Sequence, residues 1–162
     1  GKKERHELRR KVRRLEGAGP ATFRFAADAE RATVLDRFFA LHRLSRGEKA
    51  GFMTADVERF FRDIADALEP LDRLRLGALS FDGADVAVLF GFAIGKVIAL
   101  YNAAYDPGLA SLSVGIISHA WAIREAIARG YMTYDLLRGD EPYKYDLGAR
   151  DRWLARLDAE RL

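Results

Sequence analysis

One segment of the chain, residues 86–94, is apolar at every position, whichever side of a β-strand that position faces. Its alternating sets are Val86, Val88, Phe90, Phe92 and Ile94 on one side and Ala87, Leu89, Gly91 and Ala93 on the other. A strand with one face in water alternates apolar and polar residues, whereas a strand covered on both faces does not. The segment therefore predicts a central strand in a sheet flanked by helices, and an α/β fold class.

The residues around this strand predict an antiparallel meander. Apolar runs of strand length occupy residues 74–81 and 97–105. They are separated from the central strand by Asp82-Gly83 and Gly95-Lys96, which are typical of two-residue hairpin turns. The middle of the chain is therefore expected to form three consecutive antiparallel strands.

A crossover is expected after the meander. The pattern predicts a helix from Ser113 to Arg129, ended by Gly130, and then a strand from Tyr131 to Leu137. Because a strand, a helix and a second strand of one sheet form a crossover unit, the strands at 97–105 and 131–137 are expected to be parallel. The sheet is therefore mixed.

The remaining elements are assigned from shorter signals. They are a strand at Thr22–Ala26, a helix at Asp28–His42, a helix that begins after Thr54 and ends at Pro70, a helical stretch at Glu141–Leu147 and a last strand at Arg152–Ala159. In the helix after Thr54, the residues expected to face the core are Val57, Phe60, Phe61, Ile64 and Leu68. The polar loop Ser45–Phe52 is a candidate rim of a substrate cleft.

Composition indicates one globular domain. The chain has 162 residues, 49% of them hydrophobic and 31% charged, and it contains no cysteine. That absence excludes a disulfide scaffold, a thiolate zinc site, an iron–sulfur cluster and a cysteine nucleophile. The longest stretch without a charged side chain, Pro107–Ile123, carries three serines and a histidine, so it is not a membrane span. We therefore expect a soluble, cytoplasmic protein.

Positive charge is concentrated at the N-terminus. Residues 1–14 hold eight Lys or Arg and two glutamates, a local charge of +6, against +3 for the whole chain. Leu8, Val12 and Leu15 recur at helical spacing, so an apolar stripe can dock while the basic side chains stay in water. Either a connecting helix or a site for an anionic partner fits. Since the sequence starts inside a helical pattern without Met, we expect residues 1–16 to connect a missing N-terminal region to a domain at 17–162.

A candidate anion site lies where the strand at 97–105 leads into the next helix. Tyr105 ends the strand, Ser113 is placed to cap the helix, and Gly115 leaves the backbone open to a ligand. The first N–H groups of a helix have no partner within it and attract phosphate. Alternatively, Asp106-Pro107-Gly108 is only a turn and Gly115 only permits close packing of helix and sheet.

A second candidate site follows the strand at 131–137. Six ionisable side chains crowd this part of the chain: Asp135, Arg138, Asp140, Glu141, Tyr143 and Lys144. They crowd the carboxyl end of a strand, where α/β sheets bind ligands. Such a cluster offers a carboxylate base, a phenol as proton donor and cations for developing negative charge. Ion pairing among Asp135, Arg138 and Asp140 is the purely structural alternative.

Other kinds of chemistry find no support. His6, His42 and His119 show no metal-ligand spacing, and His119 lies among apolar residues, as a hydrogen-bonded core imidazole would. The serines lack a nucleophile-elbow motif, and neither a Walker nor a Rossmann fingerprint occurs. We therefore expect no metal site and no serine nucleophile.

The order of these features resembles the GNAT acyltransferase superfamily. The meander, Tyr-Asp-Pro at 105–107, Leu-Ser-Val-Gly at 112–115, the crossover helix and Tyr-Asp-Leu-Leu-Arg-Gly-Asp-Glu-Pro-Tyr-Lys at 134–144 follow one another as in that superfamily. The last sequence is most similar to the branch of the cellulose-biosynthesis (CelD-like) acetyltransferases, which is related to Fem-type aminoacyl transferases. The resemblance implies a GNAT-like acyl-CoA N-acyltransferase fold over nearly the whole chain.

The resemblance also implies acetyl-CoA, or another acyl-CoA, as co-substrate. Its pantetheine arm would lie in the gap where the strand at 97–105 splays from its neighbour, and its pyrophosphate would meet the start of the following helix. Carried over to this sequence, the residues that bind it are Tyr105, Ser113, Val114, Gly115 and Ile116. The superfamily's usual signature of Gln or Arg, then Gly, then Gly or Ala falls on Ala110, Ser113 and Gly115, so only the last position agrees.

The same resemblance implies roles for the cluster after the strand. Tyr143 resembles the tyrosine that protonates the departing thiolate, with Tyr145 as the competing candidate. Lys144 resembles a lysine of the Fem-type enzymes and would stabilise negative charge on the reacting carbonyl oxygen. The remaining assignments are Asp140 or Glu141 as the group that receives the acceptor's proton and Asp135 and Arg138 as substrate-binding residues.

We therefore expect an N-acyltransferase that moves an acetyl or other acyl group from acyl-CoA to a small-molecule or peptide amine by direct attack. Two alternatives stay open: a non-catalytic GNAT-like module that binds a partner through the basic helix or the missing half, and a transferase that uses aminoacyl-tRNA. Of these readings, only the aminoacyl-tRNA-dependent transferase is expected to bind nucleic acid, and it would do so through residues 2–14. The chain outside residues 1–14 has a net charge of −3 and shows no basic surface for nucleic acid.

Overall fold

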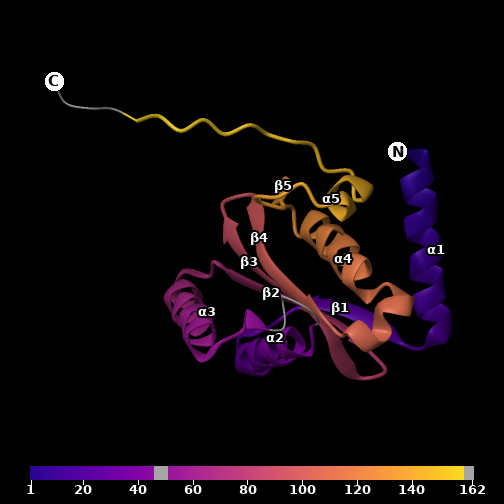
Figure 1. The fold of residues 1–162 in the computed structure, drawn as a ribbon, viewed down its shortest axis with the longest axis horizontal. Helices are drawn as coiled ribbons and strands as arrows, with labels where there is room; N and C mark the ends of the chain where they lie inside the picture. The colour runs from indigo at the N-terminus through magenta and orange to yellow at the C-terminus, as the bar shows by residue number, and fades with distance from the viewer. Residues whose placement is uncertain (46–50, 159–162) are drawn as a thin grey trace.

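The computed structural model describes residues 1–45 and 51–158. Figure 1 shows the elements in chain order: α1 (Lys2–Ala18), β1 (Ala21–Phe25), η1 (Asp28–Glu30), α2 (Arg31–Leu44), α3 (Ala55–Leu68), η3 (Glu69–Leu71), β2 (Leu74–Phe81), β3 (Ala84–Ile94), β4 (Val97–Tyr105), η4 (Pro107–Leu112), α4 (Val114–Ala128), β5 (Thr133–Asp135) and α5 (Pro142–Asp146). The elements labelled η are 3₁₀ turns. The predicted order of helices and strands up to α5 is confirmed.

The sheet has five strands in the order β1-β2-β3-β4-β5. β1 to β4 pair with their neighbours in antiparallel fashion, and β4 pairs with β5 in parallel, as the crossover predicts. The turn between β2 and β3 places Asp82 at φ 48° and Gly83 at φ 79°. Two successive positive φ angles suit the hairpin that the Asp-Gly pair predicts, because glycine adopts this conformation without steric cost.

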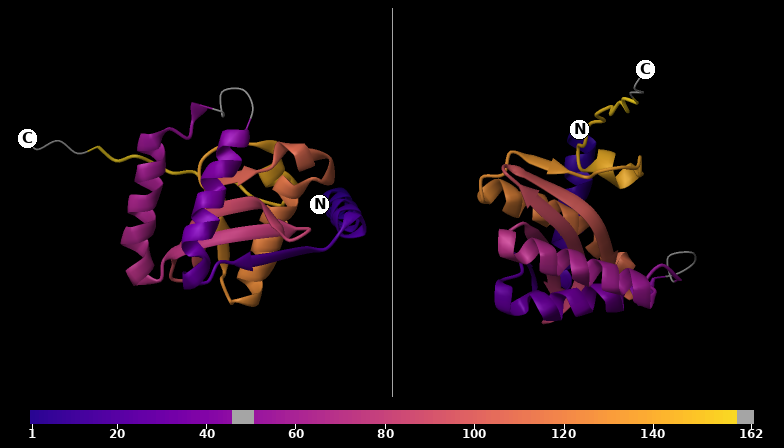
Figure 2. Two further views of the ribbon diagram at one scale, coloured as in Figure 1. Left: turned by 90° about the horizontal axis from the view of Figure 1, so that it is seen from below. Right: turned by 90° about the vertical axis from the view of Figure 1, so that its left-hand side faces the viewer.

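The central strand β3 separates two cores. Val88 and Phe90 belong to the core on the side of α2 and α3, whereas Ala87 and Leu89 belong to the side of α1 and α4. Figures 1 and 2 show these two pairs of helices on opposite faces of the sheet. On the α2 and α3 side the ring of Phe61 lies 5.1 Å from Phe38 and 4.9 Å from Phe90, in edge-to-face contacts. A strand buried on both faces was the central prediction from the sequence, and it is confirmed for residues 86–93, whereas Ile94 at the end of the strand is 61% exposed.

Helix α1 packs onto the body of the domain through the end of its apolar stripe. Leu15 is fully buried in the cluster that also contains Val114 and Trp121 of α4, and Val12 packs against that cluster. The basic side chains of α1 stay largely in water, as the amphipathic pattern predicts. None of the helices in the described ranges combines the length and apolar character that crossing a membrane requires.

Two predicted details within the domain are wrong. Phe60, expected in the core, is 49% exposed, because α3 turns Phe61 inward instead. The strand predicted at 131–137 is reduced to Thr133–Asp135. The Asp135 carboxylate accepts a hydrogen bond from the Leu137 N–H, and Leu137 takes φ 52°, so a local turn ends the strand.

The strand expected at 152–159 is not formed in residues 152–158. This part of the chain has no helix or strand and extends away from the domain, with Trp153 94% exposed (Figure 1). Its alternating sequence favours a strand, but a strand is stable only beside a partner, and none lies there among the described residues. Of the predicted rim loop Ser45–Phe52, residues 46–50 lie outside the described part of the chain.

Candidate active site

The parallel strands β4 and β5 pair over three residues and then separate. Val97 pairs with Thr133, Ile98 with Tyr134 and Ala99 with Asp135, and the pairing ends there. β4 continues for six more residues, so its outer edge from Leu100 to Tyr105 has no strand beside it in the described chain. The divergence that the resemblance implies is therefore present.

An irregularity in β4 coincides with this separation. Phe90 of β3 pairs with Asn102 and Gly91 pairs with Leu100, which leaves Tyr101 as an extra residue. Such a bulge twists its strand and turns the local side chains. The Asn102 carboxamide oxygen lies 3.0 Å from Nε2 of the buried His42, so α2 is tied to β4 at the bulge.

The start of α4 lies beyond the end of β4. Ser113 is the residue before the helix, as predicted, but its side chain does not cap the helix. Its hydroxyl oxygen instead accepts a hydrogen bond of 2.9 Å from the Arg14 guanidinium of α1. The N–H groups of Val114, Gly115 and Ile116 open the helix, and such groups lack partners within it. Arg14 therefore adds a positive charge to the positive end of the helix dipole.

Two of the predicted cofactor-binding residues contact each other. A Cβ atom on Gly115 would stand 3.1 Å from Cδ1 and 3.2 Å from Cε1 of Tyr105. Glycine at this position therefore lets the tyrosine ring, at the end of β4, lie against the first turn of α4. The packing role that the sequence left open for Gly115 has a physical basis in this contact.

The second predicted cluster gathers where α4, β5 and α5 meet. The Tyr143 ring stacks on His119 of α4, with centroids 5.0 Å apart and planes 20° apart. Burial, with a smaller contribution from the Lys144 charge, lowers the pKa of His119 to about 4. Burial, with a smaller contribution from Glu141, raises the pKa of Tyr143. A neutral imidazole therefore lies against a phenol that keeps its proton.

Lys144 is buried and its ammonium group is fully engaged. It donates to the carbonyl oxygens of Arg138 at 2.6 Å and Gly139 at 3.2 Å, and it pairs with the Glu141 carboxylate at 2.8 Å. An ammonium group has three N–H donors. As a donor to a reacting carbonyl oxygen, Lys144 would have to exchange one of these partners for the substrate.

The other members of the cluster are exposed or hold local turns. Arg138 and Asp140 are exposed, and no ion pair among the described residues joins either of them to Asp135. Tyr145 is exposed and donates to the Asp151 carboxylate at 2.9 Å. Tyr143, a residue of α5 whose ring stacks on His119 of α4, is therefore less exposed than Tyr145. The described residues contain no group of three or more His, Cys, Asp or Glu side chains that could hold a metal ion.

Two residues of this region were not predicted. Arg14 was assigned to a solvated helix face, and no local signal links it to Ser113, which lies 99 positions further along the chain. The sequence does single out Asn102, because it is the only amide side chain in the apolar strand at 97–105. A lone polar residue in a buried strand needs a hydrogen-bond partner.

An antiparallel meander, a crossover helix and a parallel strand that separates beside the start of that helix define the acyltransferase fold of the GNAT type. The family model described as acetyltransferase (GNAT) domain matches residues 2–145. The chain belongs to this family. No curated protein matches the chain by sequence.

Solved structures share the fold at low sequence identity. A GNAT-family acetyltransferase from Brucella melitensis in complex with acetyl-CoA is 14% identical, with a TM-score of 0.57 over 82% of this chain and 84% of that one. AAC(6')-Iy in complex with a bisubstrate analogue, CoA-S-monomethyl-acetylneamine, is 13% identical, with a TM-score of 0.57 over 88% of this chain and 99% of that one.

A third structure, the ribosomal-protein-S18-alanine N-acetyltransferase from Escherichia coli, is 17% identical, with a TM-score of 0.54. The alignment covers 71% of this chain and 64% of that one. At these identities the likeness concerns the fold, and the chemistry has to be argued from the residues of this chain.

Proposed function

We propose that the domain is an N-acyltransferase that moves an acetyl or related acyl group from acyl-CoA to an amine. The observation that carries the proposal is the separation of β4 from β5 beside the start of α4, where Arg14 adds a guanidinium. Similar folds that hold acetyl-CoA or a CoA bisubstrate analogue support it. On the 134–144 sequence we also propose that the chain belongs to the CelD-like branch.

The residues present fit a CoA thioester. The outer edge of β4 offers main-chain donors and acceptors to the amide groups of the pantetheine arm. The N–H groups of Val114, Gly115 and Ile116, with Arg14 beside them, suit the phosphates. A thioester supplies an activated carbonyl carbon, and the residues of the chain provide the binding and the proton transfers around it.

Direct attack needs two proton transfers. The amine nitrogen forms a bond to the carbonyl carbon, the carbon–sulfur bond breaks, the amine proton leaves, and the sulfur gains a proton. We assign the second transfer to Tyr143, whose raised pKa keeps its phenol protonated. Asp140 or Glu141 takes the amine proton, directly or through water. Lys144 stays assigned to the carbonyl oxygen, and Asp135 and Arg138 to the acceptor.

The first experiment measures CoA binding by calorimetry and acetyl transfer to a panel of amines. We expect micromolar CoA binding. Tyr143→Phe removes only a hydroxyl, so CoA affinity should persist while kcat falls by about 10²- to 10⁴-fold. The matched control is Tyr145→Phe, which removes a hydroxyl bonded to Asp151 at the surface and should retain the parent rate.

Different results lead to different conclusions. If Tyr143→Phe turns over at the parent rate and Tyr145→Phe is impaired, the proton donor is Tyr145. If neither variant changes kcat, neither tyrosine donates the proton. No heat at millimolar CoA would contradict an acyl-CoA enzyme and favour a binding module.

A further inference from the structure

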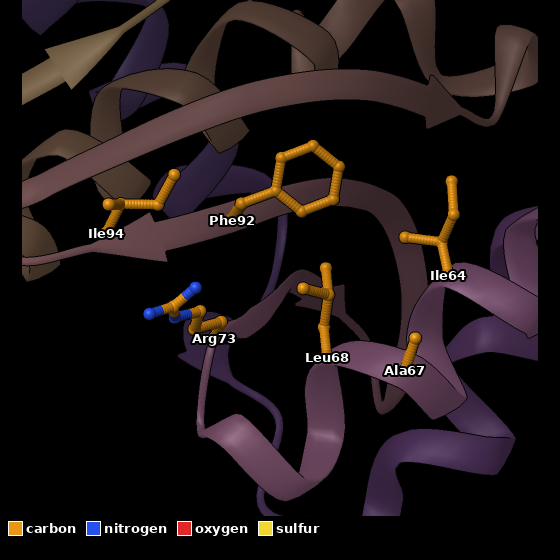
Figure 3. Close-up of a pocket in the computed structure, with 6 residues that line it drawn as sticks. All are labelled: Ile64, Ala67, Leu68, Arg73, Phe92 and Ile94. Atoms are coloured by element: carbon orange, nitrogen blue, oxygen red, sulfur yellow. The ribbon is translucent and has the colours of Figure 1, made fainter.

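A groove that the proposed chemistry does not use lies between α3 and the end of β3. Figure 3 shows its lining residues, which come from α3, from the segment before β2 and from β3: Ile64, Ala67, Leu68, Arg73, Phe92 and Ile94. Its volume is about 340 Å³. Every lining side chain except that of Arg73 is apolar. A hollow of this kind takes the apolar part of a small molecule.

Arg73 supplies one positive charge at the end of the groove. Its main chain is fixed on both sides, since its N–H donates to the Leu68 carbonyl at 3.1 Å and its carbonyl accepts from the Ala93 N–H at 2.7 Å. Its guanidinium has no hydrogen bond or ion pair within residues 1–45 and 51–158, whereas the neighbouring Asp72 pairs with Arg75. The groove therefore combines an apolar floor with a cation that is available to an anion.

One lining residue of the groove, Phe92, lies next to the place where β4 and β5 separate. The Phe92 ring lies 5.4 Å from the ring of Tyr101, the extra residue of the β4 bulge. Phe92 also pairs with Ala99, the last residue of β4 that pairs with β5. Tyr101 is 43% exposed, so the contact between the Phe92 and Tyr101 rings links the groove to apolar surface beside the separation.

We propose that this groove binds the apolar body of the acceptor amine and that Arg73 pairs with a carboxylate at the far end of that acceptor. The acceptor class is thus a medium-length apolar amino carboxylate. Arg73 beside β2 and Tyr101 on β4 are two strand spacings apart across the sheet and about three residues apart along it, a main-chain span on the order of 14 Å. The assignment of the amine end rests on the proposed function, whereas the binding of an apolar carboxylate in the groove does not.

The binding test uses octanoate, which has the apolar body and the carboxylate but no amine. In an NMR titration of isoleucine methyl groups, octanoate should shift the signals of Ile64 and Ile94 and leave Ile127, an exposed residue of α4, unchanged. Hexanoate should bind more weakly, by about fourfold for each methylene that the groove buries. Shifts confined to other isoleucines, or none, would overturn the proposal.

Matched variants test the two halves of the site. Arg73→Gln should weaken the binding of octanoate by about two- to fivefold, the range of an exposed ion pair, and Arg152→Gln, at another exposed arginine, should not. Ile94→Ser should lower the affinity for octanoate, whereas Ile127→Ser should leave that affinity unchanged. If sedimentation shows a dimer that Ile94→Ser dissociates and octanoate does not, the groove is an interface between copies and the proposal is wrong.

The activity test separates this proposal from the proposed function. With acetyl-CoA, Arg73→Gln should raise KM for 8-aminooctanoate by about two- to fivefold, leave kcat unchanged, and leave KM for octylamine unchanged. Equal effects on the two amines would overturn the role of Arg73. If octanoate binds in the groove but neither amine is acetylated, the binding site stands and the acyltransfer function fails.

Discussion

At the scale of single residues, the environment of His119 keeps its imidazole neutral. It is buried, its Nδ1 has no hydrogen-bond partner among the described residues, and Tyr143 covers one face of its ring. The hydrogen-bonded core imidazole predicted from the sequence is therefore buried, but this nitrogen is not bonded. Burial and the nearby Lys144 ammonium both oppose protonation, so His119 stays neutral where a free histidine would begin to charge.

This environment predicts an acid-sensitive stability. In the folded protein the pKa of His119 is about 4, against 6.5 for the unperturbed side chain. As the pH falls from 6.5 to 4, the unfolded chain takes up a proton that the folded chain does not. The free energy of unfolding should therefore fall across this window, by about 3 kcal/mol in all, and level off below it.

The measurement is urea unfolding at several pH values between 7 and 4. His119→Phe keeps a ring to stack on Tyr143 and removes the titrating nitrogen, so its unfolding free energy should fall less over this window. Carboxylates titrate over the same window in both proteins, so the difference between the two curves isolates the contribution of His119. Parallel curves would mean that His119 takes up its proton equally in the folded and unfolded states.

At the scale of elements, the contact between β4 and α4 predicts the behaviour of Gly115. Gly115→Val puts a branched side chain against the Tyr105 ring and beside the N–H groups that open α4. Loss of one hydrogen bond from these groups to a phosphate should weaken the binding of CoA by about tenfold or more. The domain should stay folded, since a β-branched residue lowers helix stability only slightly.

The matched control is Gly17→Val in α1, where an added Cβ meets nothing within 4 Å. Calorimetry with CoA should give the parent affinity for Gly17→Val and a weaker one for Gly115→Val, with circular dichroism to confirm the fold of both. If Gly115→Val binds CoA as the parent does, the phosphates lie elsewhere.

The elements that could be predicted are those with local causes. Asp82-Gly83 and Gly95-Lys96 set the hairpin turns through the conformation of single residues, so β2 and β4 match their predicted bounds. Thr54 was recognised because a cap acts within one turn, and its hydroxyl accepts from the Val57 N–H. The strand expected at 152–159 failed because pairing depends on a distant partner, which the alternation of side chains does not reveal.

The residues of the candidate site also divide into those whose positions have local causes and those whose contacts depend on distant parts of the chain. The sequence placed Tyr105, Ser113 and Gly115 at one junction, because they lie close together in the chain, and the structure has them there. The approach of Arg14 and the stacking of His119 on Tyr143 follow from how helices pack, which helical periodicity alone does not specify. The catalytic roles of the 135–144 cluster stay predictions.

At the scale of the whole molecule, α1 is attached to one of the two cores. Leu15 is fully buried beside α4, and the family match begins at residue 2. Leu15→Ala should therefore lower the free energy of unfolding by about 2–5 kcal/mol, the range for a buried leucine. Leu8→Ala, on the same stripe but only partly buried, is the control and should have a smaller effect. Equal, small effects in urea unfolding would mean that α1 is only a connector.

The six residues of β4 beyond its pairing with β5 have a consequence for how the protein behaves at high concentration. Their outer edge is a row of main-chain donors and acceptors, and the sequence Leu-Tyr-Asn-Ala-Ala-Tyr there contains neither a charge nor a proline. Natural sheets use such residues to keep their edges from pairing with other chains. We therefore expect this edge to pair with other chains at high protein concentration, and a ligand bound along it to reduce that pairing.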